Sequence, residues 1–177
     1  MPSVRKANAS DAATLAPNLR QADAREIKAC SGSTPLQALT HSYQHSLICY
    51  TVEDDDGTVI AMFGVAESNR PDVGIVWMLA ADRILNHRKQ LIRECRTWID
   101  RLHERFPVLW NLVDERNAVH VRWLRWLGCN FVARHEQAGV ERIPFLEFIH
   151  VCSRPRGDGR SGNRHDRSIN CCSGSCR

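Results

Sequence analysis

Apolar positions along the chain follow two periods. From Arg88 to Arg105 they recur every three or four residues, which predicts an amphipathic helix. From Val73 to Ala80 the chain is apolar without alternation, as expected of a central strand covered on both faces. Shorter stretches rich in apolar residues predict further strands at Val4–Ala7, Leu47–Val52, Thr58–Ala66, Val108–Val113, Asn130–Arg134 and Ile143–Val151.

Polar and proline positions predict where the other helices begin and end. Two helical stretches, Asp11–Leu15 and about 18–29, are separated by Pro17. Thr34 then provides a capping hydroxyl, and Pro35 falls at the first helical position. The predicted order is one strand, two or three helices, three strands, a long helix, a strand, a short helix and two strands.

The segment between the strand at 108–113 and the next strand is the most informative part of the chain. Asn117 follows the strand end, where its side-chain oxygen can cap the helix that comes next. Gly128 lies where that helix must end in a left-handed conformation. An Asn, a helix of about three turns, Leu-Gly and an aromatic strand therefore follow one another here.

This order of elements resembles the GNAT acyltransferase domain over residues 3–151. The resemblance implies an α/β (α+β) fold with a mixed, largely antiparallel central sheet flanked by helices. Within that superfamily, four stretches resemble the small internal virion proteins of short-tailed phages, over about residues 4–150. That family is GNAT-like in fold and works in particle assembly or inside the phage head. The four stretches are Leu19–Asp23, Ala61–Val65, Val113–Asn117 and Arg122–Gly128.

Charge divides the chain into two parts. Residues 1–152 contain 18 Lys or Arg and 18 Asp or Glu, so residues 153–177 carry the whole formal charge of +4. We therefore predict one GNAT-like domain at 1–152 and a disordered basic Arg/Gly/Ser/Cys tail at 153–177. The balanced charge of the domain gives no electrostatic case for nucleic-acid binding.

Compartment and metal binding follow from what the sequence lacks. Met1–Lys6 contains no apolar signal region, and no apolar run approaches the roughly 20 residues of a membrane helix. We expect no membrane partner, and a location in the host cytoplasm during assembly or in the virion interior. Cys171, Cys172 and Cys176, with His165 upstream, fit no standard zinc spacing, so no metal site is predicted.

The resemblance also indicates where acetyl-CoA or CoA would bind, if the site is retained. GNAT enzymes hold the pyrophosphate on backbone amides before the long helix, usually in the order Arg or Gln, two residues, Gly, one residue, Gly or Ala. Arg83 stands at the Arg position, but Ile84, Asn86 and Arg88 occupy the glycine region, where side chains are expected to crowd the phosphates. The basic side chains could pair with an anion, or could form a solvated helix start. The candidate cofactor-binding residues are Met78, Ala80, Arg83, Arg88 and Asn117.

The catalytic residues of such an enzyme are harder to find. Many GNAT enzymes use a Tyr seven residues after the Asn as general acid, and this chain has Leu124 there. His120 is the candidate substitute, although a His on an apolar helix face is more often a core residue. Glu67, Asp82 and Asp114 follow strands and are base candidates without a recognisable partner.

Two hypotheses follow. The first is a phage-encoded internal virion or particle-assembly protein on a GNAT-like scaffold, with a degenerate acetyl-CoA site, little catalysis, and phage structural or assembly proteins as partners. The alternative is an acetyl-CoA-dependent N-acetyltransferase acting on an amine of a small molecule or host protein. The first hypothesis gives a role to Trp123 and Trp126 as a binding surface flanked by Arg122 and Arg125, since Trp and Arg are frequent at protein interfaces.

Overall fold

Seven strands form one sheet in the order β1-β2-β3-β4-β5-β7-β6. β4 and β5 pair in parallel, and every other neighbouring pair is antiparallel. The computed structural model describes residues 2–152, so the predicted tail at 153–177 lies outside the described residues. The strands are β1 (Ser3–Lys6), β2 (Ser46–Glu53), β3 (Val59–Glu67), β4 (Val73–Ala80), β5 (Val108–Asp114), β6 (Asn130–Ala138) and β7 (Ile143–Val151). The predicted mixed, largely antiparallel sheet is confirmed.

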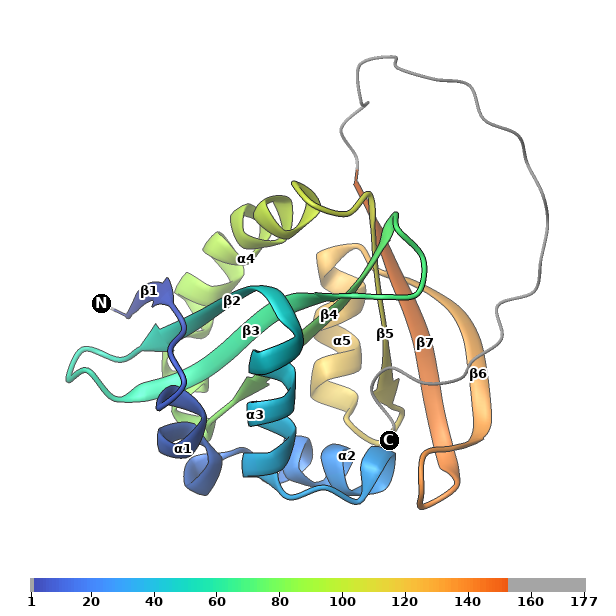
Figure 1. Cartoon of the computed structure of the whole chain (residues 1–177), viewed down its shortest axis with the longest axis horizontal. Helices are drawn as coiled ribbons and strands as arrows, with labels where there is room; N and C mark the ends of the chain where they lie inside the picture. Colours follow the sequence, from blue (N-terminus) through green and yellow to red (C-terminus); the bar gives the residue numbers. More distant parts are fainter. Residues whose placement is uncertain (1, 153–177) are drawn as a thin grey trace, which may run out of the picture.

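Helices cover both faces of this sheet (Figure 1). α4 and α5 pack on one face, where Cys95 of α4 and Leu124 of α5 share a core with Val113 of β5. α1 and α3 pack on the other face, around Met62 of β3. The helices are α1 (Asp11–Leu15), α2 (Gln21–Ser31), α3 (Pro35–His45), α4 (Arg88–His103) and α5 (Ala118–Leu127), with 3₁₀ turns η1 (Ala16–Asn18) and η2 (Asp82–His87). None of these helices is long and apolar enough to cross a membrane.

Local signals explain the boundaries of α3 and α5. Thr34 and Gln37 form a reciprocal capping box before α3. Gly128 ends α5 with φ 97°, a conformation that favours glycine, and its N–H donates to the carbonyls of Leu124 and Arg125. Both predicted boundaries are confirmed.

Three segments of the structure differ from the prediction. The helix predicted at 18–29 begins at Gln21, because residues 16–18 form η1 and Leu19 forms a bridge with Ala81. The strand predicted at 130–134 continues to Ala138, since it pairs with β7 from Ile149 back to Ile143. The segment before α4, which lacks the expected glycines and for which no element is predicted, forms the 3₁₀ turn η2.

α2 lies where β4 and β5 end, and the turn between β6 and β7 rests against its last residues. The Val140 N–H donates to the Cys30 carbonyl at 3.1 Å, and the Glu141 N–H donates to the Ala29 carbonyl at 3.1 Å. Gly139 has φ 66°, and a Cβ atom there would lie 2.3 Å from the Ala29 oxygen. Glycine therefore permits the close contact between this turn and α2.

Candidate functional site

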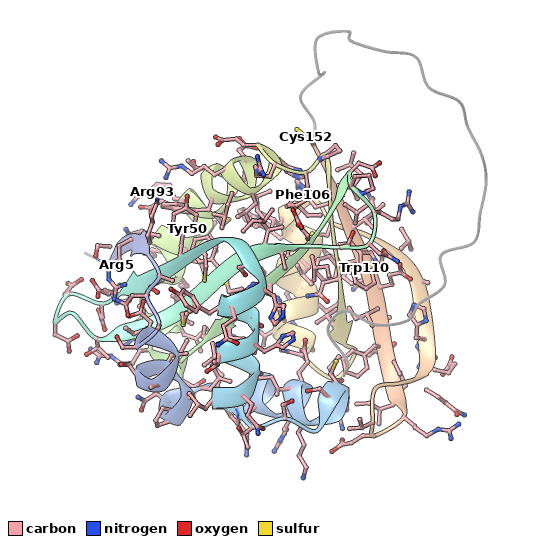
Figure 2. The ribbon with its side chains drawn as sticks, in the orientation of Figure 1. Arg5, Tyr50, Arg93, Phe106, Trp110 and Cys152 are labelled. Atoms are coloured by element: carbon pink, nitrogen blue, oxygen red, sulfur yellow. The ribbon has the colours of Figure 1, made fainter. Side chains whose placement is uncertain are left out.

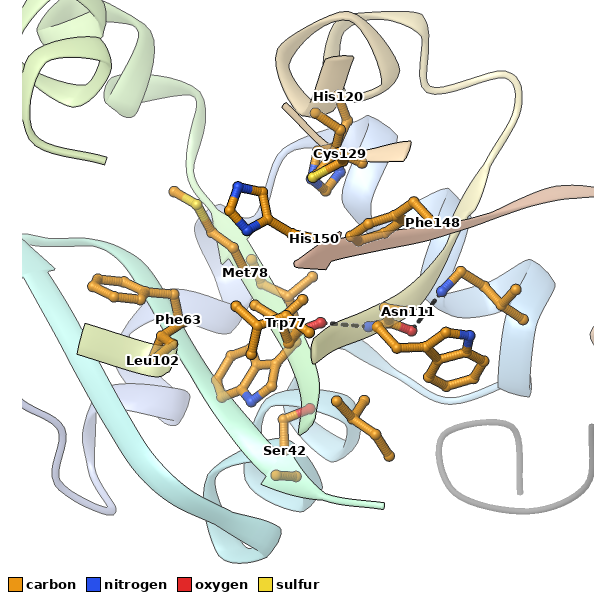
Figure 3. Close-up of a pocket in the computed structure, with 18 of the residues that line it drawn as sticks. Ser42, Phe63, Trp77, Met78, Leu102, Asn111, His120, Cys129, Phe148 and His150 are labelled. Atoms are coloured by element: carbon orange, nitrogen blue, oxygen red, sulfur yellow. Dashed lines mark hydrogen bonds between the residues drawn. The ribbon is translucent and has the colours of Figure 1, made fainter. Parts of the chain in front are cut away.

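The centre of the sheet contains a split between β4 and β5. Their parallel pairing covers Val73 to Ile75 on β4 and Val108 to Trp110 on β5, and both strands continue beyond it. A cavity of about 1430 Å³ lies against both strands, α4 and α5. Its lining includes Met78 of β4 and His120 of α5, which Figure 3 shows in close-up. The split and this cavity form the candidate site.

Asn111 bridges the split immediately beyond the last paired residues (Figure 3). Its Nδ2 donates to the Val76 carbonyl of β4 at 2.7 Å, and its Oδ1 accepts from the Leu112 N–H at 2.7 Å. A side chain thus supplies the cross-strand hydrogen bond that the backbone no longer makes. The sequence contains one signal of this bridge, a polar residue inside the apolar run of β5. Sequence reasoning missed Asn111 as a residue of the site.

The N-terminus of α5 is tied to α2 through a partly buried polar pair, Asn117 and Glu26. The Asn117 Oδ1 caps the helix by accepting from the His120 N–H at 3.4 Å. The Asn117 Nδ2 donates to Glu26 Oε2 at 3.0 Å. Burial raises the pKa of Glu26 to about 8, and the negative charges of Asp23 and Asp114 act in the same direction. Glu26 is therefore largely protonated at neutral pH.

The structure supports a cap role for Asn117 and brings an unpredicted carboxyl group beside it. Sequence reasoning missed Glu26 because it is 91 positions away and lies in a polar stretch of α2. Among the predicted base candidates, Asp114 is buried and paired with Arg116 at 2.7 Å. Asp82 is exposed on η2, and Glu67 lies at the exposed end of β3 beside the cavity.

His120 lies on the inner side of α5 and contributes to the cavity lining. Burial lowers the pKa of its imidazole to about 4, so the ring is neutral at physiological pH. Its Nδ1 is buried without a hydrogen-bond partner within residues 2–152, and its ring tilts against Trp123 at 5.7 Å between centroids. Leu124, one turn later, is 3% exposed in the core. His120 can serve as a neutral hydrogen-bonding group here.

The predicted phosphate-binding residues are engaged in contacts within the protein. Arg83 pairs with Asp54 at 2.6 Å and with Asp56 at 3.0 Å, both in the turn between β2 and β3. His87 shares Asp54, with a distance of 2.8 Å from Nε2 to Oδ1. The arginine at the expected phosphate-binding position is thus already paired with carboxylates.

Two backbone N–H groups before and at the start of α4 also donate hydrogen bonds within the protein. The Ile84 N–H donates to the Ala81 carbonyl, and the Arg88 N–H, the first of α4, donates to the Leu85 carbonyl. The Ile84 side chain is 3% exposed and packs into the core beside Phe63. The Ile84 side chain thus belongs to the core and also borders the cavity. Arg88 itself is exposed.

The remaining candidate, Ala80, is covered by α2. Its N–H donates to Asp23 Oδ2 at 3.1 Å, and its carbonyl accepts from the Arg20 N–H at 2.9 Å. Of the six predicted site residues, Met78 and His120 line the cavity, whereas Ala80, Arg83, Arg88 and Asn117 lie outside its lining. Residues 2–152 hold no cluster of three or more metal-ligating side chains.

Comparison with known proteins gives two results, one from sequence and one from structure. A family model described as "Bacteriophage T7, probable scaffold protein Gp13" matches residues 55–136, which run from the turn before β3 into β6. No curated protein matches the sequence.

Solved structures of acetyltransferases resemble the whole described domain. The ribosomal-protein-S18-alanine N-acetyltransferase from Escherichia coli has a TM-score of 0.65 and 14% identity, covering 91% of this chain and 100% of that one. A GCN5-related N-acetyltransferase from Kribbella flavida has a TM-score of 0.61 and 19% identity, covering 85% and 98%. Ard1 from Thermoplasma volcanium has a TM-score of 0.65 and 9% identity, covering 86% and 99%. At these identities the likeness shows the fold alone. The chain therefore has the GNAT fold, and its residues 55–136 are similar to the phage scaffold-like family that this model describes.

Proposed function

We propose that this chain is a phage-encoded particle-assembly protein of the internal virion type, which acts through protein contacts on a GNAT-like scaffold with little or no acetyl transfer. The observation that carries the proposal is that the segment before α4, where CoA phosphates would bind, is occupied by contacts within the protein. This segment lies inside the region that matches the phage family, and its arginine and two of its amides are already bound within the protein.

To bind before α4, a CoA pyrophosphate would have to displace ion pairs and hydrogen bonds that this segment already makes within the protein. A phosphate site needs free N–H donors and an unpaired cation at a helix start. Here Arg83 would have to leave two carboxylates, and the Arg88 N–H would have to leave the Leu85 carbonyl. The free energy lost with each broken contact cancels part of the free energy gained from the new contact to phosphate. Tight pyrophosphate binding is therefore disfavoured.

The position of the usual general acid also holds a residue that cannot transfer a proton. Leu124 cannot protonate a leaving thiolate, and it is packed in the core. On this proposal the partners are phage structural or assembly proteins. The protein would act in the host cell during assembly, with the virion interior as its final location.

Calorimetry of the full chain with acetyl-CoA and with free CoA tests the absence of a working cofactor site. We expect binding too weak to detect. A dissociation constant below about 1 μM would overturn this part of the proposal. In that case Arg83→Ala should weaken binding, because the arginine would then contact phosphate.

The assembly role is tested in the phage that encodes the chain. Deletion of its gene should change the protein composition of the particles, measured by mass spectrometry, and the wild-type gene supplied in trans should restore it. Particles of unchanged composition and infectivity would count against an assembly role.

The alternative, an N-acetyltransferase for a small-molecule or protein amine, is favoured by one specific observation. The β4–β5 split, the Asn117 cap and the cavity are all retained, and the neutral His120 ring borders that cavity. Turnover of acetyl-CoA with mixed amines, abolished by His120→Ala in a variant that still folds, would establish this alternative.

A further inference from the structure

The outer surfaces of α4 and α5 meet at a contact between Arg96 and Trp126. The guanidinium of Arg96 on α4 lies 5.1 Å from the ring centroid of Trp126 on α5, which joins the two helices at the surface. Figure 2 labels Arg93 on the same helix, at the periphery of the molecule. We name this the α4–α5 face. Its exposed residues include Arg88, Lys89, Ile92, Arg93, Arg96 and one acidic residue, Asp100, of α4, and Val119, Arg122 and Trp126 of α5.

The cations of the α4–α5 face have no carboxylate partners among the described residues. Five arginines elsewhere in the domain are paired with Asp or Glu, among them Arg20 with Asp23 at 2.5 Å and Arg116 with Asp114 at 2.7 Å. The ion pairs within residues 2–152 include none of the five cations of this face. The domain has zero net charge overall, so this local excess is balanced by acidic groups elsewhere.

Apolar side chains lie among these cations. Ile92 and Trp126 are each 44% exposed, and Val119 is 60% exposed. Val119, Arg122 and Trp126 are spaced by three and four residues, so they share one side of α5. Exposed aromatic and aliphatic groups surrounded by arginines are typical of protein interfaces, where Trp and Arg contribute much of the binding energy.

We propose that the α4–α5 face docks an acidic segment of a partner protein, with its carboxylates on Arg93, Arg96 and Arg122 and an apolar side chain against Trp126. This inference rests on the proposed function and specifies the surface that makes the assembly contact. Charge complementarity selects the occupant, since unpaired arginines bind carboxylates in planar, bidentate geometry. Residues 153–177 of this chain, with a formal charge of +4, do not match the charge of this face. A nucleic-acid backbone would satisfy the arginines but leave Ile92 and Val119 uncovered.

The test uses the full chain and two labelled peptides of equal length, measured by fluorescence anisotropy. One is a helical peptide of glutamate, alanine and leucine, and the other has lysine in place of glutamate. We expect the acidic peptide to bind at least about tenfold more tightly than the basic one, with an affinity that falls as salt is added. Arg93→Glu should weaken its binding by about tenfold, because it turns an attraction into a repulsion. Trp126→Ala should weaken it through loss of the apolar contact.

The matched control is Arg25→Glu, which makes the same charge change at an exposed position of α2 and should leave binding unchanged. Arg93 makes no hydrogen bond or ion pair within residues 2–152, so Arg93→Glu should keep the wild-type melting temperature. Equal binding of both peptides, no binding of either, or equal effects of Arg93→Glu and Arg25→Glu would each overturn the proposal. Tighter binding of a DNA oligonucleotide than of the acidic peptide would overturn it in favour of a nucleic-acid surface. The deletion experiment in the phage is independent of this test, so the assembly role can stand even if this surface fails.

Discussion

At the scale of single residues, the ionisation of Glu26 is expected to make stability depend on pH. Its pKa is about 8 in the folded protein and near 4.5 when unfolded, because burial disfavours the charged form. Its contribution is fully present below about pH 4.5 and is lost as pH rises through 8. Glu26→Gln keeps a carbonyl to accept from Asn117 and cannot ionise. The variant should therefore gain stability relative to wild type as pH rises from 4.5 to 8.

Urea unfolding of both proteins across this pH range measures that difference. The comparison is needed because His120 acts in the opposite sense. Its pKa is lowered to about 4, so it takes stability away as pH falls below its unfolded value of 6.5. A stability difference between the two proteins that does not change with pH would show that Glu26 titrates normally.

Asn111 gives a second test at this scale. Asn111→Leu removes the donor to the Val76 carbonyl, which lies in the half-buried split. An unpaired carbonyl there should cost about 1–3 kcal/mol of unfolding free energy. Asn111→Asp retains the acceptor for the Leu112 N–H but also loses the donor, so it should be destabilised at neutral pH as well. If both variants unfold at the wild-type urea concentration, the bridge contributes nothing to stability.

At the scale of elements, Gly57 and Gly139 allow the cost of backbone strain to be measured apart from the cost of a steric clash. Gly139 and Gly57 both have positive φ, but a Cβ at Gly57 meets nothing within 4 Å, whereas one at Gly139 would meet the Ala29 oxygen of α2. Gly57→Ala should cost about 1 kcal/mol for the conformation alone. Gly139→Ala should cost more, because it also forces the β6–β7 turn away from α2. Equal losses in thermal unfolding would show that this contact is not stabilising.

The elements also show what the sequence could and could not predict. α3, α5 and the β4 strand follow from local signals, namely a capping residue, a terminal glycine and an unbroken apolar run. η2 does not follow from the sequence, because the segment carries no capping or terminal signal of its own and its Ile84 stands at a glycine position of the motif that the segment resembles. An apolar side chain between a strand and a helix indicates a core contact equally well.

The candidate site was predicted less well than the fold, since its contacts join residues distant in sequence. Asn117 was found because capping is local. Its partner Glu26 and the bridge from Asn111 to Val76 depend on how α2 and the two strands meet, which no spacing along the chain encodes. The pairing of Arg83 with the hairpin turn is of the same kind.

At the scale of the whole molecule, the role of residues 153–177 is still a prediction. A chain ending at Cys152 should keep the wild-type melting temperature, because the removed segment offers few apolar side chains for burial. Differential scanning calorimetry measures this. A large drop in melting temperature, or loss of soluble protein, would show that the tail packs against the domain.

The sheet consists of two antiparallel halves, β1–β4 and β5–β7–β6, which meet over three parallel register pairs. These three pairs are fewer than those of any other neighbouring strands within residues 2–152. Because so few backbone hydrogen bonds hold the seam, we expect it to open more readily than either half. Amide hydrogen exchange at Ile75 and Trp110 should then report the opening of this seam at a lower free energy than exchange within either half. The domain would thus open along its middle before it unfolds.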